Sequence, residues 1–324
     1  MLETRSFNIC FLDLLQMQPP FNLSTTAFFE EILARVEPRR ERWKLQIGKL
    51  FFPEQTNRWL RYVHAHPHLF SQVQHFPKLL TKIYRPYVSR KFNCQGRVDH
   101  LIAHYELVAQ LNLSQLIGQA LTQEMVLASL QDKVHHPLKL VLGAIRHGHR
   151  EGEIEFQLKW QDTIIFSMTC SLMATSTGLA LKIAKIQGSA EVHARDAIKQ
   201  ATKACYGARP QTVLLQVAQA FGEEVGCQEI ILIGNQNRVS LNPMRRRKIT
   251  SNYDAIWLEH GALPHHTGDY CLPSAAQRQL DLTEVPSHKR SQYRKRFALF
   301  EEIHLQVRMN VAAHRQAIIP FSPS

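Results

Sequence analysis

The spacing of hydrophobic residues changes along the chain near residue 123. Before that point they recur three or four positions apart, as in Leu101, Tyr105 and Val108. This period is typical of amphipathic helices. Ser24 offers an N-cap for a first helix over the stripe from Phe28 to Val36. Further helices are expected over residues 57–66, over 77–89 with a bend or an end near Pro86, and over 98–110.

Short apolar or alternating runs follow and predict five strands. They cover residues 125–130, 138–145, 153–160, 163–172 and 179–186. The connections are short, and short connections make neighbouring strands antiparallel, so we expect a meander. Gln161 and Asp162 separate two of these runs and predict a tight hairpin turn.

Helical spacing returns after Gly188. Pro210 suits the first turn of a helix and Gly226 suits its C-cap. The expected helices cover 190–205, 210–225, 251–260 and a basic segment 287–309, with a buried strand at 229–233 and an edge strand at 270–272. The predicted fold class is α+β. A helical N-terminal lobe (1–122) precedes a lobe (123–324) whose mixed, largely antiparallel sheet is flanked by helices.

Composition narrows the class of protein. The chain has 324 residues, of which 44% are hydrophobic, as in ordinary globular proteins. Six cysteines without C-x-x-C spacing indicate reduced thiols and a cytoplasmic protein. No apolar run reaches the roughly 18 residues of a transmembrane segment. G-x-S-x-G, Walker A and H-E-x-x-H motifs are absent, so the common hydrolases, P-loop proteins and zincins lack support.

A net charge of +12 suggests an anionic partner, which could be nucleic acid, a phosphate-bearing small molecule or an acidic lipid surface, and a basic surface without a specific partner explains the charge equally. Basic runs lie at Arg245–Lys248 and at Lys289–Arg296, where Tyr293 is interleaved. Phosphate contact and stacking would suit nucleic acid, but no nucleic-acid-binding module surrounds either run. Peripheral contact with anionic lipid at the inner membrane is the alternative, and a simple solvated helix face is another.

The joints between expected elements hold the candidate site residues. Gln187, Gly188 and Ser189 lead from a strand into a helix, whose N-terminus would suit an anion. An ordinary capped turn explains them equally. Arg209 could clamp a phosphate or carboxylate, or could satisfy carbonyls at the end of a helix. The histidines, including His64, His66 and His68, lack a completing ligand set, so no metal is expected.

Several short motifs occur together in one order and resemble the VirK/YbjX family. They are His104-Tyr105, Glu151-Gly152-Glu153, Ile186-Gln187-Gly188, Gly207-Ala208-Arg209-Pro210, Asn252-Tyr253-Asp254 with Trp257, Leu272-Pro273, and Lys289-Arg290 with Tyr293, Arg294 and Arg296. The resemblance implies a bacterial protein associated with virulence, envelope properties and antimicrobial peptide resistance. It implies no established catalytic residues.

A more distant likeness is to the second half of N-acetyltransferase-like (GNAT) folds. It implies that Gln187, Gly188 and Ser189 bind the pyrophosphate of a coenzyme A thioester. Asn235 would support the cofactor, and Tyr253 would protonate the departing thiolate. Only one glycine follows Gln187, and an extra helix (210–225) precedes the next strand, and both depart from the GNAT pattern.

These observations lead to two functional hypotheses. The first is acyl transfer from a thioester to an amine or hydroxyl, with Glu151 or Glu153 as base and Tyr253 as acid. Arg209 would then join the cofactor site, and Asn252, Asp254 and Trp257 would contact the substrate. The second is a non-enzymatic basic protein that supports the envelope by holding an anionic lipid or a protein client.

Overall fold

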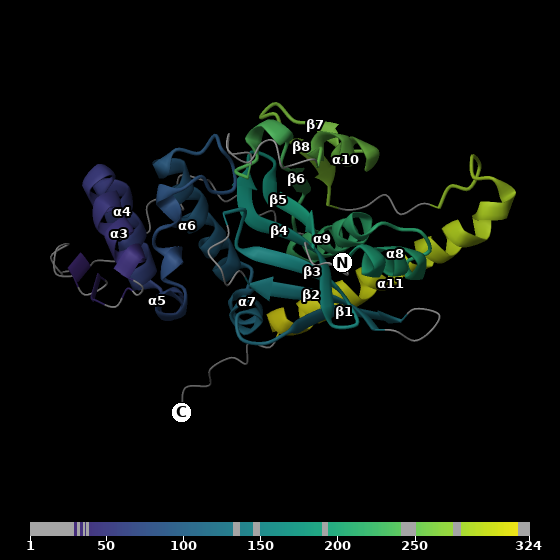
Figure 1. Cartoon of the computed structure of the whole chain (residues 1–324), viewed down its shortest axis with the longest axis horizontal. Helices are drawn as coiled ribbons and strands as arrows, with labels where there is room; N and C mark the ends of the chain where they lie inside the picture. The colour runs from purple at the N-terminus through teal and green to yellow at the C-terminus, as the bar shows by residue number, and fades with distance from the viewer. Residues whose placement is uncertain are drawn as a thin grey trace, which may run out of the picture.

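One mixed sheet forms the centre of the molecule, with strand order β1-β2-β3-β4-β5-β6-β8-β7 among the described residues (Figure 1). The computed structural model describes residues 29–30, 33–34, 36, 39–131, 137–144, 150–189, 194–240, 251–274 and 280–316. Helices cover both faces of the sheet, and strands are mostly antiparallel, so the α+β class predicted from the sequence is confirmed.

The expected meander is present. It consists of β1 (Met125–Gln131), β2 (Pro137–Ala144), β3 (Ile154–Trp160), β4 (Thr163–Thr175) and β5 (Gly178–Gly188), each antiparallel to the next. Buried and half-buried residues alternate without a break along β3. Gln161 and Asp162 have φ of 47° and 64°, as a two-residue hairpin turn requires.

Two helices carry the chain from β5 to a parallel neighbour. They are α8 (Ala194–Ala204) and α9 (Pro210–Val225), and β6 (Glu229–Leu232) follows them. Pro210 opens α9 and Gly226 ends it with φ of 89°, as predicted. The local signals succeeded here because proline fixes the first turn and glycine adopts a left-handed cap without strain.

The chain then adds one more strand than expected. After η3 (Asn235–Asn237) and α10 (Tyr253–Glu259), β7 (Leu263–Pro264) pairs with β8 (Tyr270–Pro273), which pairs with β6. The prediction that 270–272 form the edge was therefore wrong. The two-residue β7 lies outside β8, because the hairpin folds back on its outer side.

Five helices precede the sheet in the described residues. They are α3 (Arg39–Phe51), α4 (Pro53–Ala65), α5 (Pro67–His75), α6 (Cys94–Gln110) and α7 (Ser114–Ala120). Helices α4 and α6 correspond to predicted ones, and the side chain of Asn93 caps α6. The prediction missed α3, α5 and α7. Of the helix expected from Phe28 to Val36, residues 29, 30, 33 and 34 are helical, and residues 28, 31, 32 and 35 lie outside the described residues.

The helix expected over 77–89 is wrong. Two 3₁₀ turns, η1 (Pro77–Leu79) and η2 (Lys82–Tyr84), occupy its first half, and Arg85 is extended with φ of −122° and ψ of 154°. Pro86 explains the break, because a proline excludes the preceding residue from the helical region.

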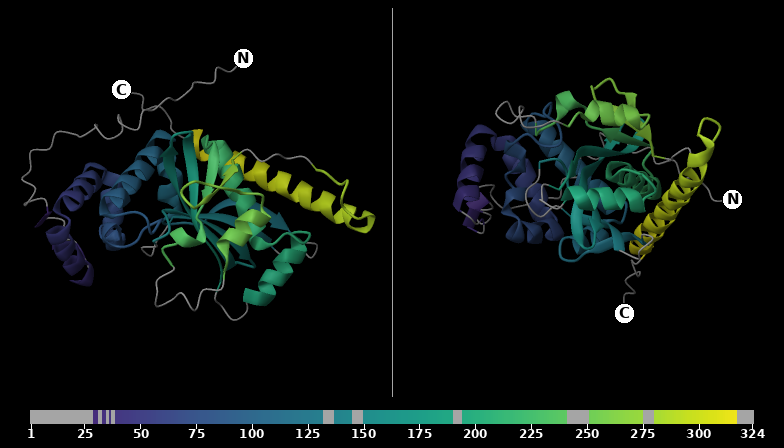
Figure 2. Two further views of the ribbon diagram at one scale, coloured as in Figure 1. Left: turned by 90° about the horizontal axis from the view of Figure 1, so that it is seen from above. Right: turned by 45° about the vertical axis from the view of Figure 1, so that its right-hand side comes forward.

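The N-terminal helices and α9 lie on opposite faces of the sheet (Figures 1 and 2). On one face Phe221 of α9 contacts Phe156 with ring centroids 5.3 Å apart. On the other, Nε2 of His100 on α6 lies 2.8 Å from Oγ of Ser171. One cluster of buried hydrophobic residues runs through both parts of the chain. A boundary at residue 122 stays a prediction.

The C-terminal helix α11 (Ser287–Gln316) packs along α9 and β1, and its first turns project beyond the sheet (Figure 1). Among the described helices, none is long and apolar enough to cross a membrane.

Candidate functional site

The parallel strands β5 and β6 separate at their carboxyl ends, which lie along one edge of the sheet. They pair from Ala180 opposite Glu229 to Ile183 opposite Leu232, and β5 then continues to Gly188 paired with β4 but not with β6. A register shift in the pairing of β4 with β5 coincides with this divergence. Ligands of α/β sheets commonly bind in crevices beyond the carboxyl ends of parallel strands. Most of the residues predicted from sequence lie at this edge.

Tyr253, at the start of α10, contacts the end of β5 on the side where β6 no longer pairs with it. Its hydroxyl donates to the carbonyl oxygen of Ile186 at 2.6 Å and accepts from the N–H of the same residue at 2.9 Å. Burial raises the pKa of this hydroxyl, and Arg238 partly offsets the effect. The bond that the hydroxyl donates to Ile186 would have to open before Tyr253 could protonate a leaving group, and its role as acid stays a prediction.

Asn235 connects the end of β6 to α10. Its N–H donates to Asp254 Oδ1 at 2.8 Å, and its side-chain oxygen accepts from the N–H of Tyr253 at 3.0 Å. Its amide nitrogen donates to Asn252 Oδ1 at 2.6 Å, and that oxygen also caps α10. The four predicted residues Asn235, Asn252, Tyr253 and Asp254 therefore form one hydrogen-bonded network.

Arg238 is a functional candidate that sequence analysis missed. Its side chain is only 5% exposed, and its guanidinium carbon lies 3.5 Å from the ring centroid of Tyr253. Nη1 donates to the carbonyl of Ser251 at 2.8 Å, whereas buried Nε has no hydrogen-bond partner. Within the described ranges it forms no ion pair. A buried charge that has no ion pair among these residues is costly, so this position suits an anionic ligand.

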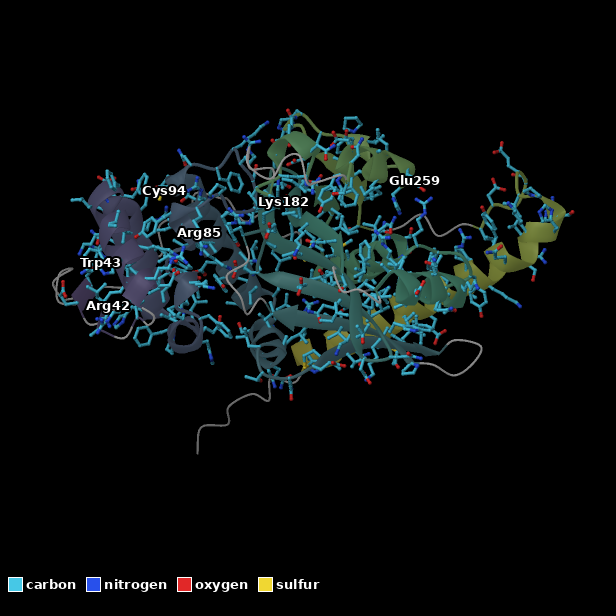
Figure 3. All side chains as sticks on the ribbon, viewed as in Figure 1. Arg42, Trp43, Arg85, Cys94, Lys182 and Glu259 are labelled. Carbon is cyan, nitrogen blue, oxygen red and sulfur yellow. The ribbon has the colours of Figure 1, made fainter. Side chains whose placement is uncertain are left out.

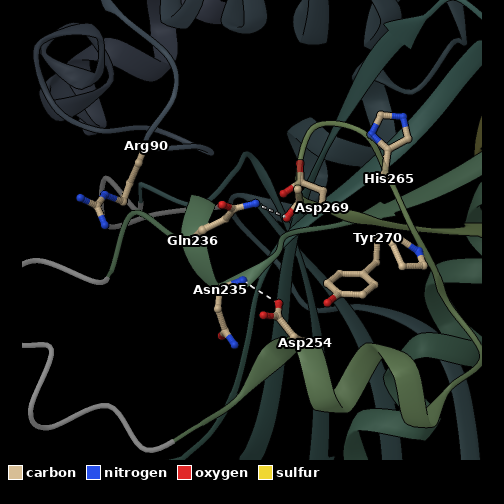
Figure 4. Close-up of a pocket in the computed structure, with 9 residues that line it drawn as sticks. Arg90, Asn235, Gln236, Asp254, His265, Asp269 and Tyr270 are labelled. Carbon is tan, nitrogen blue, oxygen red and sulfur yellow. Dashed lines mark hydrogen bonds between the residues drawn. The ribbon is translucent and has the colours of Figure 1, made fainter.

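A polar cavity of about 430 Å³ opens beside this network (Figure 4). The residues that line it are Arg90, Asn235, Gln236, Asp254, Pro264, His265, Gly268, Asp269 and Tyr270. Only Asn235 and Asp254 were predicted. The others come from the β7–β8 hairpin, from η3 and from the segment before α6, so no local sequence signal could have identified them.

Asp269 forms a fixed, satisfied part of the cavity wall. Its carboxylate accepts from Lys182 Nζ at 2.7 Å, from Asn237 Nδ2 at 2.7 Å and from the N–H of Gly234 at 3.0 Å. Burial alone would raise the pKa of Asp269, but Lys182 and these hydrogen bonds hold it below its ordinary value. Asp269 is therefore an ionised anchor rather than a proton donor near neutral pH.

The predicted phosphate turn lies at the end of β5. Gly188 pairs with Phe166, and the N–H of Ser189 donates to the carbonyl of Ile165 at 2.9 Å. The side chain of Gln187 is exposed. The start of the expected helix, 190–193, lies outside the described residues, so its role in anion binding stays a prediction.

Two other predicted residues lie around α10: Arg209 contacts its C-terminal end, and Trp257 belongs to its inner face. Arg209 precedes α9 and forms an exposed ion pair with Glu259 at 3.0 Å. Trp257 is buried and donates from Nε1 to the carbonyl of Ile233 at 2.8 Å. Neither lines the cavity. Their geometry is that of contacts that hold α10 against the sheet.

The two predicted bases lie in different surroundings. Glu151 is half-buried, and its charge helps to raise the pKa of Tyr253 after the larger effect of burial. Glu153 is buried beneath α6, where Lys82 forms an ion pair with it and Tyr87 and Tyr105 donate to it at 2.7 and 2.6 Å. Burial would raise the pKa of Glu153, but Lys82 holds it low.

Only the second of the two basic runs lies within the described residues. Arg245–Lys248 lies outside the described residues. Lys289 and Arg290 are exposed on the projecting start of α11, and Arg296 donates to the carbonyl of Tyr206 at 3.2 Å. This end of α11 lies away from the cavity (Figure 1).

Comparison with known proteins places the chain among uncharacterised bacterial sequences. Residues 35–309 match the family described as "Protein of unknown function (DUF535)". The chain is 24% identical over 275 residues to the "Uncharacterized protein YbjX" of Escherichia coli K12, covering 83% of each. It is 25% identical over 222 residues to an "Uncharacterized protein" of Haemophilus influenzae, covering 68% of this chain and 73% of the other. No solved structure matches.

Proposed function

The chain belongs to the DUF535 family, whose proteins are of unknown function, and we propose that it binds a phosphate-bearing ligand beside Arg238. The observation that carries the proposal is the buried guanidinium, which forms no ion pair within the described residues. A phosphate accepts two parallel hydrogen bonds from an arginine and would supply the missing negative charge.

We extend the proposal to acyl transfer, with a coenzyme A thioester as ligand and an amine or hydroxyl acceptor in the cavity. The base would take a proton from the acceptor while its nitrogen or oxygen bonds to the thioester carbonyl carbon, the carbon–sulfur bond would break, and the thiolate would take a proton from Tyr253. Asp254, half-buried in the cavity wall, is suited to orient an amine. Of the two predicted bases we favour Glu151, because Glu153 is already engaged by Lys82 and two tyrosines.

Thermal unfolding with coenzyme A, acetyl-coenzyme A, a long-chain acyl-coenzyme A and inorganic pyrophosphate tests the proposal. A ligand at about 100 times its Kd adds about 2.7 kcal/mol to the free energy of unfolding. We expect Arg238→Gln to abolish the stabilisation and Arg238→Lys to reduce it. Arg308→Gln on α11, where Arg308 contacts Glu223 at 3.3 Å, is the matched control.

The four probes separate the parts of the proposal. A shift with pyrophosphate alone supports the anion site without the thioester, and a larger shift with acyl-coenzyme A supports both. Absence of any shift would remove the phosphate ligand. An undiminished shift in Arg238→Gln would place the ligand elsewhere.

A second function is favoured by the projecting start of α11. Lys289, Arg290, Arg294 and Lys295 are all exposed there, as a surface that attracts anionic lipid requires. Association with phosphatidylglycerol vesicles should then weaken with salt and fall in an Arg294→Gln/Lys295→Gln variant. Unchanged association in that variant would count against α11 as the contact.

A further inference from the structure

Helix α3 presents a row of large hydrophobic side chains to solvent. Trp43, Ile47, Leu50 and Phe51 are 65%, 51%, 78% and 70% exposed. Positions i, i+4, i+7 and i+8 fall on one face of a helix, so the four side chains form a continuous stripe. Contiguous exposed hydrophobic surface commonly marks an interaction site.

The opposite face of α3 is held against the protein. Leu45 is fully buried, and Gly48 lies so close to Tyr84 that a Cβ there would overlap the tyrosine ring. Buried Glu41 accepts from Thr81 Oγ1 at 2.6 Å and forms an ion pair with Lys44. These contacts fix the rotation of the helix, so the stripe cannot turn inward without breaking them.

Cations accompany the stripe. Arg39 and Arg40 are exposed one turn before Trp43, and half-buried Lys44 flanks it. The only carboxylate of α3 is Glu41, which is on the buried face. A short helix with tryptophan, leucine and phenylalanine on one face and arginines beside them is typical of helices that lie in the membrane interface.

The position of α3 suits a broad, flat partner. Trp43 lies at the outer end of the molecule, on the far side of the N-terminal helices from the sheet (Figure 3). The projecting start of α11 lies at the opposite end (Figure 1). A planar lipid surface can therefore reach the whole stripe without touching the cavity or α11.

We propose that α3 docks onto the surface of an anionic lipid bilayer. Trp43, Ile47, Leu50 and Phe51 enter the interface between head groups and acyl chains. Arg39 and Arg40 contact lipid phosphates. The proposal is independent of the Arg238 site and of the basic end of α11.

Trp43 provides its own reporter. The other three tryptophans, Trp59, Trp160 and Trp257, are 0%, 6% and 1% exposed. Tryptophan fluorescence should shift to the blue when vesicles of phosphatidylcholine with phosphatidylglycerol are added. It should change little with phosphatidylcholine alone, and Trp43→Phe should remove the signal while sedimentation with vesicles persists.

Vesicle sedimentation with matched variants tests the surface. We expect Trp43→Ser/Phe51→Ser to weaken binding by about tenfold or more, since two interfacial anchors are lost. Leu305→Ser/Met309→Ser is the control, because these α11 residues are 60% and 63% exposed but lie elsewhere. Arg39→Gln/Arg40→Gln should weaken binding only to vesicles that contain phosphatidylglycerol.

Three results would overturn the proposal. One is equal vesicle binding by Trp43→Ser/Phe51→Ser and the parent protein. This result counts against α3 even if Leu305→Ser/Met309→Ser loses binding. Another is a Trp43 that is already shielded from acrylamide without lipid, which would mean that the chain itself covers the stripe. The third is that the parent binds no vesicles and forms an oligomer that Trp43→Ser/Phe51→Ser does not form. The partner of the stripe would then be a second copy of the chain.

Discussion

The hydroxyl of Tyr253 both donates to and accepts from the backbone of Ile186, at 2.6 and 2.9 Å. A tyrosine thereby replaces the neighbouring strand that β5 lacks beyond Ile183. This single side chain joins α10 to the end of β5, and the guanidinium of Arg238 lies over the face of its ring.

We expect Tyr253→Phe to lower the free energy of unfolding by about 1–3 kcal/mol, because both backbone groups of Ile186 would be left unpaired in a buried place. Urea unfolding measures the effect. Tyr293→Phe is the control: Tyr293 is half-exposed on α11, so its loss of a hydroxyl should change the free energy of unfolding little. Equal stability of both variants would mean that water replaces the hydroxyl.

The same variant tests the catalytic hypothesis. If Tyr253 protonates a departing thiolate, Tyr253→Phe lowers turnover by about 10²-fold and leaves the thermal shift with acyl-coenzyme A largely intact. The rate is compared at a temperature where both proteins remain folded. Parent-like turnover would remove Tyr253 from the mechanism.

The two buried histidines of α6 should make the protein sensitive to acid. Burial lowers the pKa of His100 to about 3 and that of His104 to about 4, from an ordinary value of 6.5. In the unfolded chain both histidines therefore become protonated near pH 6.5, whereas in the folded chain they stay neutral until the pH is much lower. Each histidine should remove about 1.4 kcal/mol of stability per pH unit below 6.5, down to its folded pKa.

Urea unfolding at several values between about pH 5 and pH 7 measures this slope. His104→Gln should make it shallower, since glutamine can still accept from the N–H of Leu172, as Nδ1 of His104 does at 3.0 Å. His288→Gln, on exposed α11, should leave it unchanged. A slope that is the same in all three proteins would contradict a neutral buried His104.

Glu153→Gln should destabilise the protein by about 3–5 kcal/mol near neutral pH, because buried Lys82 would lose its counter-charge. The pKa of Glu153 is held below its ordinary 4.5 by Lys82, against the effect of burial. The carboxylate of Glu153 therefore adds to the free energy of unfolding above pH 4.5. This stabilisation is lost as the pH falls through the lower pKa that Glu153 has in the folded protein.

The difference in the free energy of unfolding between Glu153→Gln and the parent should accordingly become smaller in strong acid. Chemical unfolding of Glu153→Gln, Lys82→Met/Glu153→Gln and the exposed control Glu54→Gln gives the comparison. The double variant should recover part of the loss, since it removes both charges. No recovery would point to the tyrosine hydrogen bonds as the dominant contribution.

Two glycines should respond to alanine in opposite directions. A Cβ at Gly234 would overlap the carbonyl oxygen of Gly268, so Gly234→Ala must move the β7–β8 hairpin and disturb the cavity wall. Gly118 lies in α7 with open space around it, so Gly118→Ala should stabilise by about 0.5–1 kcal/mol. Differential scanning calorimetry of both variants checks the signs, and a neutral Gly234→Ala would mean that the hairpin moves freely.

Local patterns predicted a large part of the fold. The alternation in residues 153–160 became β3, Gln161 and Asp162 made the hairpin turn, and Pro210 and Gly226 bounded α9. Each of these outcomes depends on residues that are neighbours in sequence. Rules of periodicity, capping and turn conformation apply to such segments before any packing occurs.

The site was predicted less completely. Asn235 was expected at the cofactor, Tyr253 as the acid, and Asn252 and Asp254 at the substrate, and the four residues form one network. Arg238 and the β7–β8 residues of the cavity were missed, because nothing near them in sequence marks a buried arginine or a hairpin that closes over η3. Glu153, a predicted base, lies instead in a buried ion pair with Lys82.

The sequence by itself determined the α+β class, the meander and the residues that gather at the end of β5. Only the tertiary structure decided that Arg238 is buried without an ion pair in the described residues, and that the stripe from Trp43 to Phe51 faces outward. The physical reason is that burial and charge compensation depend on segments far apart in the chain. Helix and strand periods show that one face is apolar, but only packing shows whether that face is covered.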